Sequence, residues 1–201
     1  YFYPYIELKS RISLTNENAQ ANCSTAYLSL FNKLLDSKKT EEIDSFLVSI
    51  DPYFHFIRNH FSSSTELNDK LKIFTQYKQY FLELKAREQG DLCNWVQAVS
   101  IYQSITENPS FIESPEFYNN YAICYLNWGV ETKNKEYLKK ALKLCKDESI
   151  LDKCKKNICL IDFEYYLQKG ELHKAEEILK ECFQENSPEY KQLQLILNNS
   201  H

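Results

Sequence analysis

The sequence contains few of the residues that most often interrupt helices, since three of its 201 residues are glycine and five are proline. Tight hairpins and phosphate-binding loops need glycine, so its scarcity predicts a nearly all-helical protein. No apolar run approaches the roughly 18 residues of a membrane-spanning helix, and we expect no membrane span. Methionine is absent, even at position 1, and we interpret the chain as a fragment of a longer protein.

The sequence also carries little excess charge, because its formal net charge is −4. This balance gives no overall attraction to nucleic acid or to acidic membranes. The local exception is a lysine-rich stretch, Lys133–Lys156, in which nine lysines outnumber four acidic residues. It supports an alternative hypothesis, a helical-repeat nucleic-acid-binding or regulatory protein. We favour a solvated helix face, because Tyr137 is the only aromatic residue of the stretch that could stack on a base.

The seven cysteines form neither an even set nor a C-x-x-C pair, which argues against a disulfide framework. Several of them fall on apolar helical positions, where a free thiol packs as a small hydrophobic group. We therefore expect buried, free cysteines and a cytoplasmic protein. Cys154 and Cys159 have the spacing of one loose pair of zinc ligands, but no second pair accompanies them, so we expect no metal site.

Motifs of known catalytic chemistry are missing. The sequence has no glycine-rich phosphate loop, no G-x-S-x-G elbow and no dinucleotide fingerprint. His55 and His60 are five residues apart, which is off the i, i+4 spacing that places two ligands on one helix face. We therefore predict no catalytic residue, no cofactor and no enzymatic activity. The remaining enzyme hypothesis is a deep pocket that these two histidines line together with carboxylates distant in sequence.

The N-terminal part is predicted to consist of an extended segment followed by helices. In residues 1–20, apolar and polar residues alternate with a period of two, which favours an extended segment. Residues 21–78 carry apolar residues at helical spacing, and we expect these helices to pack on the segment that follows. The alternatives are packing against the rest of a longer protein or against a second copy of the chain. Thr40 is expected to cap a helix that stops before Pro52, and Pro52 to open the next short helix.

Three helical hairpins are predicted next, followed by a capping helix, at residues 79–109, 115–148, 156–188 and 189–201. The last hairpin has the clearest pattern. Gly170 ends its first helix, and Ala175, Leu179 and Cys182 recur at i, i+4 and i+7 on the second helix. In the second hairpin, Gly129 is expected to mark the turn, which places Asn134 where the two helices cross.

This pattern resembles tetratricopeptide repeats, in which each hairpin buries its apolar face only against its neighbours. The resemblance covers about residues 79–198 and implies an all-α, right-handed superhelix of antiparallel helix hairpins. It also implies that Ala98, Ala141 and Ala175 are buried where paired helices cross. Two features depart from the family: successive hairpins start 36 and 41 residues apart instead of about 34, and Cys93 stands where a turn glycine is usual.

In tetratricopeptide folds, the first helices of successive hairpins line a concave groove that holds a peptide or a helix of a partner. Asparagine suits such a groove, because its side chain can both donate to and accept from a peptide backbone. We therefore predict a non-catalytic protein–protein interaction scaffold that binds another protein. The alternative, that the groove positions are ordinary helix-surface residues, stays open. The predicted partner-binding residues are Glu83, Arg87, Asn119, Asn120, Ile123, Asn157, Leu160 and Glu164.

Overall fold

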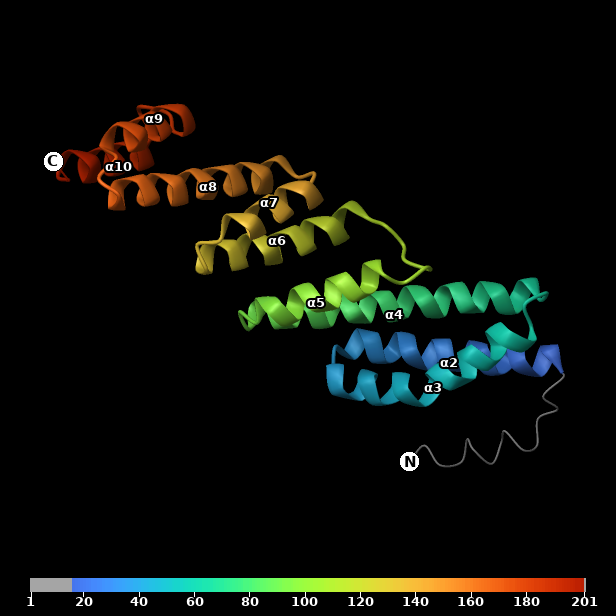
Figure 1. The fold of residues 1–201 in the computed structure, drawn as a ribbon. Coiled ribbons are helices and arrows are strands. Elements are labelled where there is room, and N and C mark those ends of the chain that lie inside the picture. The colour runs from blue at the N-terminus through green and yellow to red at the C-terminus, as the bar shows by residue number, and fades with distance from the viewer. Residues whose placement is uncertain (1–15, 201) are drawn as a thin grey trace. The chain divides into compact units, whose positions relative to one another are not determined.

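The structure, a computed structural model, describes residues 16–200, which form nine α-helices and no strand (Figure 1). The prediction of an all-α fold is therefore confirmed for this part of the chain. None of the described helices is long and apolar enough to cross a membrane. The extended segment predicted for residues 1–20 lies outside the described residues up to residue 15. The prediction of an extended segment is wrong for residues 17–20, because α2 begins at Glu17. The Asn16 side chain caps this helix by accepting a hydrogen bond from the N–H of Ala19.

The described residues group into two compact units. Unit 1 comprises residues 16–85 and 104–112, and unit 2 comprises residues 86–103 and 113–200. The division falls within two helices, α4 and α5, each of which contributes to both units. The helices in chain order are α2 (Glu17–Ser37), α3 (Thr40–His60), α4 (Thr65–Asp91), α5 (Trp95–Thr106), α6 (Pro115–Glu131), α7 (Lys135–Leu144), α8 (Glu148–Gln168), α9 (Leu172–Cys182) and α10 (Pro188–Asn198).

The core of unit 1 is built from aromatic rings of α2, α3 and the first part of α4. Phe54 and Phe74 stack with ring centroids 4.0 Å apart, and Phe31 packs against Phe74 from α2. The Tyr53 hydroxyl joins α3 to α2 within this core, since it donates to the buried carbonyl of Gln20 at 2.8 Å and lies 3.0 Å from the buried Ser24 hydroxyl. Rings of this size bury a large apolar area from few residues, so a small number of side chains fills the space between the three helices.

Helix α3 runs without a break through Pro52, which corrects the predicted stop before that residue. A proline inside a helix leaves the carbonyl four residues earlier without its N–H partner. The helix continues because Ile50 and Phe54, on either side of the proline, are both buried in the core, while Pro52 is exposed. Burial of these side chains offsets the missing hydrogen bond. Thr40 is the first residue of α3 and not its cap.

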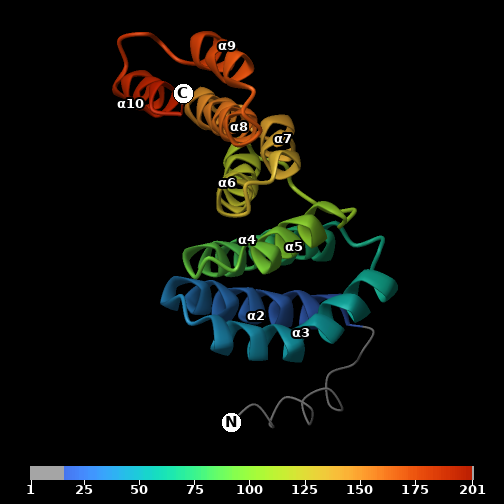
Figure 2. The ribbon, with the colours of Figure 1, turned by 60° about the vertical axis from the view of Figure 1, so that its left-hand side comes forward.

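In unit 2, α6 packs on α7, α7 on α8, α8 on α9 and α9 on α10, so neighbours in sequence are neighbours in space (Figure 2). Helix α6 also contacts α8, the first helix of the following hairpin. Helix α8 begins at Glu148, before the predicted hairpin start at 156, because the Asp147 side chain caps it by accepting from the N–H of Ile150. The C-terminal core gathers α8, α9 and α10 around Phe163 and Leu179.

Three turns of unit 2 share one backbone geometry. Each is a three-residue connection whose central residue has a positive φ, 59° at Cys93, 51° at Lys133 and 71° at Gly170. The N–H of the central residue donates to the carbonyl three residues earlier, and the following N–H donates to the carbonyl five residues before it, at 2.8–3.3 Å. This pair of bonds is the Schellman arrangement that ends many helices. The turns predicted at Gly170 and Cys93 are therefore confirmed.

Gly129 does not lie in a turn, which corrects the prediction for the second hairpin. It is buried within α6, and Lys133 occupies the turn. Asn134 is the cap of α7, where its side chain accepts from the N–H of Glu136 at 3.0 Å. The missing side chain at Gly129 instead lets α7 approach, since a Cβ atom at this position would lie 2.8 Å from the side chain of Leu138.

One pair of positions recurs in all three hairpins, with one position on each helix. In the second hairpin the small residue is on the first helix and the large residue on the second, which is the reverse of the order in the other two hairpins. Counted from the central turn residue, the pair lies four residues before it on the first helix and five residues after it on the second. The pairs are Gly129 with Leu138, Gln89 with Ala98, and Tyr166 with Ala175. Ala98, Ala141 and Ala175 are all fully buried, so the predicted burial of these small residues is confirmed.

Candidate partner-binding surface

One face of α6 in unit 2 combines amide and apolar side chains that are exposed or partly exposed. Its residues, called here the α6 stripe, are Glu116, Asn120, Ile123, Asn127 and Val130. At about 100° per residue, these positions fall within an arc of about 80°. Ile123 is 38% exposed and Val130 is 43% exposed, so two branched apolar side chains face solvent one above the other. Single exposed apolar residues are common, so the stripe is a candidate surface because two of them stand beside amide groups on one helix.

The structure brings only part of the predicted partner-binding set to this stripe. Asn120 and Ile123 belong to it, whereas Asn119 is turned inward, and its Oδ1 accepts from the Cys145 thiol at 3.2 Å. Since this contact uses the amide oxygen, Asn119 supports the packing of the segment after α7.

The predicted residues on α8 make contacts within unit 2. The Nδ2 of Asn157 donates to the Lys153 carbonyl in its own helix at 2.8 Å. Leu160 packs against the C-terminal core, and the Glu164 carboxylate is ion-paired with Lys133. These three side chains therefore have structural partners already, and they do not extend the α6 stripe by themselves.

The predicted residues on α4 fall in different units. Glu83 belongs to unit 1, where its carboxylate accepts from Gln79 at 3.1 Å. Arg87 belongs to unit 2 and is exposed.

Sequence reasoning missed Asn127 and Val130, because it predicts that the first helix of the second hairpin ends at Gly129. The signal that identifies them is helical spacing from Asn120, since Asn127 lies at i+7 and Val130 at i+10. A glycine inside a helix is equally a sign of close packing against a neighbour, which is the role that Gly129 has here.

A second exposed feature lies where the first turn of unit 2 meets the end of α6. A cleft of about 360 Å³ contains both tryptophans of the chain and the 61%-exposed Val96. The Trp95 indole donates to the Glu131 carboxylate, and Trp128 stacks on Tyr137 with ring centroids 3.8 Å apart. Tryptophan and tyrosine are enriched among residues that contribute most to protein–protein binding. The cleft is lined by Cys93, Asn94, Trp95, Val96, Gln97, Trp128, Glu131 and Thr132.

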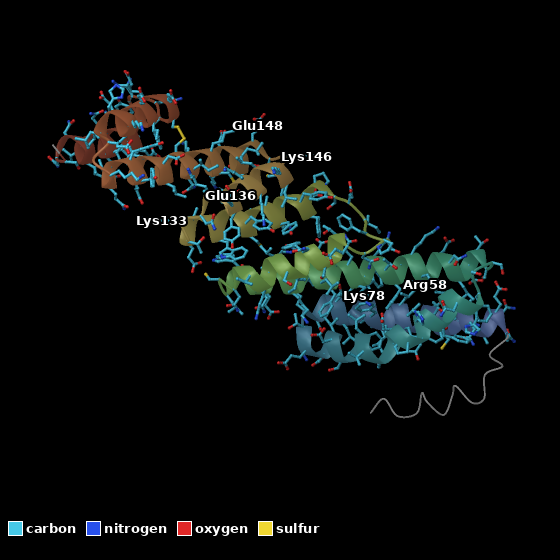
Figure 3. The ribbon with its side chains drawn as sticks, viewed as in Figure 1. Arg58, Lys78, Lys133, Glu136, Lys146 and Glu148 are labelled. Carbon is cyan, nitrogen blue, oxygen red and sulfur yellow. A yellow bond between two sulfur atoms is a disulfide. The ribbon has the colours of Figure 1, made fainter. Side chains whose placement is uncertain are left out.

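The lysine-rich stretch surrounds α7, with Lys133 before the helix and Lys146 after it (Figure 3). Lys133 and Lys135 form ion pairs with Glu164 and Asp162 of α8. Lys139 pairs with Glu136 at 2.7 Å, and the ammonium of Lys140 lies 5.3 Å from the centre of the Tyr125 ring. Four of the nine lysines are thus engaged within unit 2, which reduces the positive charge available to an acidic ligand. The remaining lysines of the stretch are Lys143, Lys146, Lys153, Lys155 and Lys156.

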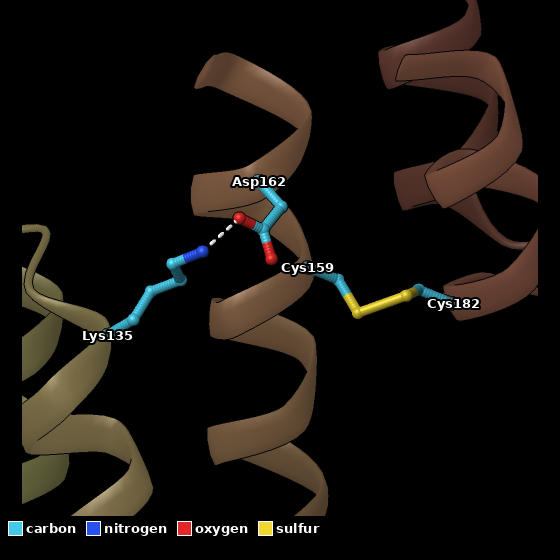
Figure 4. Close-up of a disulfide and its surroundings, with 4 residues drawn as sticks. All are labelled: Lys135, Cys159, Asp162 and Cys182. Atoms are coloured by element: carbon cyan, nitrogen blue, oxygen red, sulfur yellow. Dashed lines mark hydrogen bonds and ion pairs between the residues drawn. A yellow bond between two sulfur atoms is a disulfide. The ribbon is translucent and has the colours of Figure 1, made fainter. Parts of the chain in front are cut away.

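The thiols of unit 2 differ from the prediction of buried, free cysteines in two respects, the first being that Cys93 is exposed. Cys159 of α8 and Cys182 of α9 form a disulfide, so the expectation of free cysteines is wrong for these two (Figure 4). The pairing was not visible in the sequence because the partners are 23 residues apart and meet only through the α8–α9 turn. Disulfides are typical of oxidising compartments, and the cytoplasmic location stays a prediction. The free cysteines among the described residues are Cys23, Cys93, Cys124, Cys145 and Cys154.

Burial makes two of these free thiols poor nucleophiles. Desolvation, with a smaller contribution from the charge of Asp91, raises the pKa of Cys124 to about 11. Desolvation, with a smaller contribution from Cys145, raises the pKa of Cys154 to about 11. The reactive form of a cysteine is the thiolate, so both side chains serve as packing groups at neutral pH.

We expect Cys93 to be the first free thiol of unit 2 to react with iodoacetamide in the folded chain, because it is exposed in a turn. Cys124 and Cys154 should react only after unfolding, even at about pH 10, because a pKa of about 11 keeps most of each thiol protonated. Peptide mapping of a labelling time course, with and without urea, measures the order. Labelling of Cys124 as fast as Cys93 in the absence of urea would contradict this assignment.

The enzyme hypothesis based on the histidines receives little support from unit 1. A small cavity of about 120 Å³ is lined by His55 together with Asp51, Arg58 and Lys78, but His60 is not among its lining residues. Lys78 and Asp51 neutralise one another as an ion pair at 2.6 Å. Cavities that hold a substrate or cofactor usually reach about 300 Å³ or more.

No group of three or more His, Cys, Asp or Glu side chains within residues 16–200 is placed to hold a metal ion.

No family model, no curated protein and no solved structure matches the chain. The fold and the surface are therefore the basis for a functional proposal.

Proposed function

We propose that unit 2 is a non-catalytic protein-interaction module of stacked antiparallel helix hairpins, similar in plan to tetratricopeptide repeats, and that it binds a peptide or helix of a partner protein. Two features support the repeat plan. The three turns centred on Cys93, Lys133 and Gly170 have the same hydrogen bonds, and each is followed by a short second helix that buries a small or apolar residue. Repetition of one hairpin geometry is the basis of a solenoid, in which each hairpin contacts its neighbours.

The α6 stripe is the observation that carries the proposal. Its Asn120 and Asn127 side chains stand seven residues apart with Ile123 between them, so amide groups flank an apolar contact. An amide can pair with the N–H and C=O groups of an extended chain, and the branched side chain excludes water from those bonds. Because all three side chains stand on one helix, the partner segment loses most of the conformational freedom on binding, and the module loses little.

The tryptophan-containing cleft extends this surface along α6, since Glu131 and Thr132 directly follow Val130 of the stripe. A partner that contacts Ile123 and Val130 can therefore also reach the rim of the cleft. Aromatic groups there offer apolar area at a small cost in side-chain entropy.

The test begins with selection of peptides from a displayed random library against the whole chain, and calorimetry then gives the dissociation constant of a selected peptide. We expect Ile123→Glu to raise that constant about tenfold or more, because it places an unpaired charge in the apolar part of the contact. The substitution should leave the helix content unchanged, since Ile123 is 38% exposed in the free chain.

The matched control is Val48→Glu, which puts the same charge in place of a branched apolar residue that is 77% exposed on α3 of unit 1. It should leave peptide binding unchanged. Equal binding by the wild-type chain and Ile123→Glu, or selection of no peptide at all, would show that the α6 stripe is not the binding surface.

A further inference from the structure

A cavity of about 620 Å³ in unit 2 has the Cys159–Cys182 disulfide in its wall. The cavity is bounded by the middle of α8, the end of α9 and the segment that leads to α10. Both cysteines line the cavity and are only partly buried. The volume falls in the range of about 300–1,000 Å³ that holds small ligands. The lining residues are Asp152, Lys155, Lys156, Cys159, Glu181, Cys182, Phe183, Gln184, Ser187 and Glu189.

The charged side chains of this wall are of both signs. Lys155 and Lys156 face the cavity together with the carboxylates of Asp152, Glu181 and Glu189. Within the part of the chain that the structure describes, none of these five forms an ion pair, in contrast to Lys133 and Lys135. A wall with two ammonium groups and several carboxylates complements a zwitterion better than it complements a simple anion or cation.

The two sulfur atoms stand in different electrostatic surroundings. Lys155 and Lys156 precede Cys159 by four and three residues on α8, which places their ammonium groups one helical turn away on the same side. Cys182 is the last residue of α9, so its sulfur lies at the negative end of the helix dipole, and Glu181 lines the same cavity. A thiolate is therefore more stable at Cys159, and Cys182 is the better target for attack.

We propose that the Cys159–Cys182 disulfide is a thiol–disulfide exchange site for a small zwitterionic peptide thiol of the glutathione class. Glutathione carries two carboxylates and one ammonium group, which match the two lysines and the carboxylates of the cavity wall. The exchange site involves residues outside the α6 stripe, and the proposal is independent of the peptide-binding function.

In the first step, the glutathione thiolate attacks the Sγ of Cys182. A sulfur–sulfur bond forms between them, the Cys159–Cys182 bond breaks, and its electron pair leaves as the Cys159 thiolate beside Lys155 and Lys156. A second glutathione thiolate then attacks the glutathione sulfur of the mixed disulfide and releases Cys182 as a thiolate. Two glutathione thiols are thereby oxidised to glutathione disulfide, the protein disulfide is reduced by two electrons, and the two cysteines take up the two protons.

The experiment follows the first step in the full chain. Glutathione is added at a series of concentrations, the reaction is stopped with N-ethylmaleimide, and peptide mapping locates both modifications. We expect glutathione on Cys182 and maleimide on Cys159, with a rate that saturates as the glutathione concentration rises. The neutral thiol 2-mercaptoethanol, which lacks the charged groups, should react without saturation. Glutathione found equally on both cysteines, or a rate for glutathione that never saturates, would overturn the proposal.

Charge variants separate the role of the lysines from simple exposure of the disulfide. Lys155→Gln with Lys156→Gln should slow the reaction with dilute glutathione about fivefold, because the Cys159 leaving group loses its neighbouring cations. Lys153→Gln is the matched control, since Lys153 is an exposed lysine of the same helix that does not line the cavity. Equal rates for the double variant and the control would also reject the site.

Discussion

Loss of the Cys159–Cys182 disulfide is expected to lower the free energy of unfolding of unit 2 by about 3 kcal/mol, the entropic effect of opening a loop of this length in the unfolded chain. The bridge spans 23 residues and joins α8 to α9, the two helices that hold Phe163 and Leu179 of the C-terminal core. Without it, the last hairpin is held closed by the packing of this core and by the hydrogen-bonded turn at Gly170. Urea denaturation of the oxidised chain and of the Cys159→Ser/Cys182→Ser variant measures the difference.

The readout can be made specific for unit 2, because Trp95 and Trp128 both belong to it and their fluorescence reports on its unfolding. Cys93→Ser serves as the control, since this cysteine is exposed and makes no disulfide. It should leave the urea midpoint unchanged. A double-serine variant that unfolds at the same urea concentration as the wild-type chain would show that the bridge adds nothing to the stability of the unit.

Replacing Gly129 by alanine is expected to destabilise unit 2 by about 1–3 kcal/mol, the usual cost of adding a methyl group to a packed core. The new Cβ atom would lie 2.8 Å from the Cγ and Cδ2 atoms of Leu138 and 3.1 Å from its backbone nitrogen. Leu138 is fully buried and cannot simply swing away. Alanine favours a helix over glycine by about 1 kcal/mol, but this gain is smaller than the strain of moving α7 from α6.

The double variant Gly129→Ala/Leu138→Ala tests the cause, because it removes the side chain that the new methyl group strikes. Its loss of stability should be smaller than the sum of the two single losses, which is the mark of direct contact. Gly90→Ala is the matched control, since a Cβ there meets Trp95 and Cys124 only at 3.6 and 3.7 Å. That substitution should be neutral or stabilising. Additive losses at Gly129 and Leu138 would contradict the contact.

The sequence predicts the helical elements well where apolar spacing and caps agree. Gly170 marks its turn because a positive φ suits glycine, and the burial of Ala175 follows from the spacing after that turn. Pro52 misled the prediction, because the local cost of a proline does not reveal how much core lies on either side of it. Gly129 misled the prediction of the second turn, because glycine is found both in turns and where two helices pack closely together.

Only some residues of the candidate surface can be predicted from the local sequence pattern. Asn120 and Ile123 lie on the same face of α6, as their spacing in a helix predicts. Asn119, their neighbour, is held by the Cys145 thiol of a later segment, and no local pattern reveals a partner 26 residues away. The disulfide depends in the same way on how closely α8 and α9 approach, which the spacing of Cys159 and Cys182 alone does not give.

The reversed order of small and large residues in the second hairpin has a consequence for mispairing. If α6 met the second helix of another hairpin, Gly129 would face an alanine and leave a void. If α7 met the first helix of the last hairpin, Leu138 would collide with Tyr166 at the same register. Either exchange is unfavourable, so the size pattern discriminates between neighbours with otherwise similar turns. A grafted or shuffled hairpin from this chain should therefore be moved with both of its helices together.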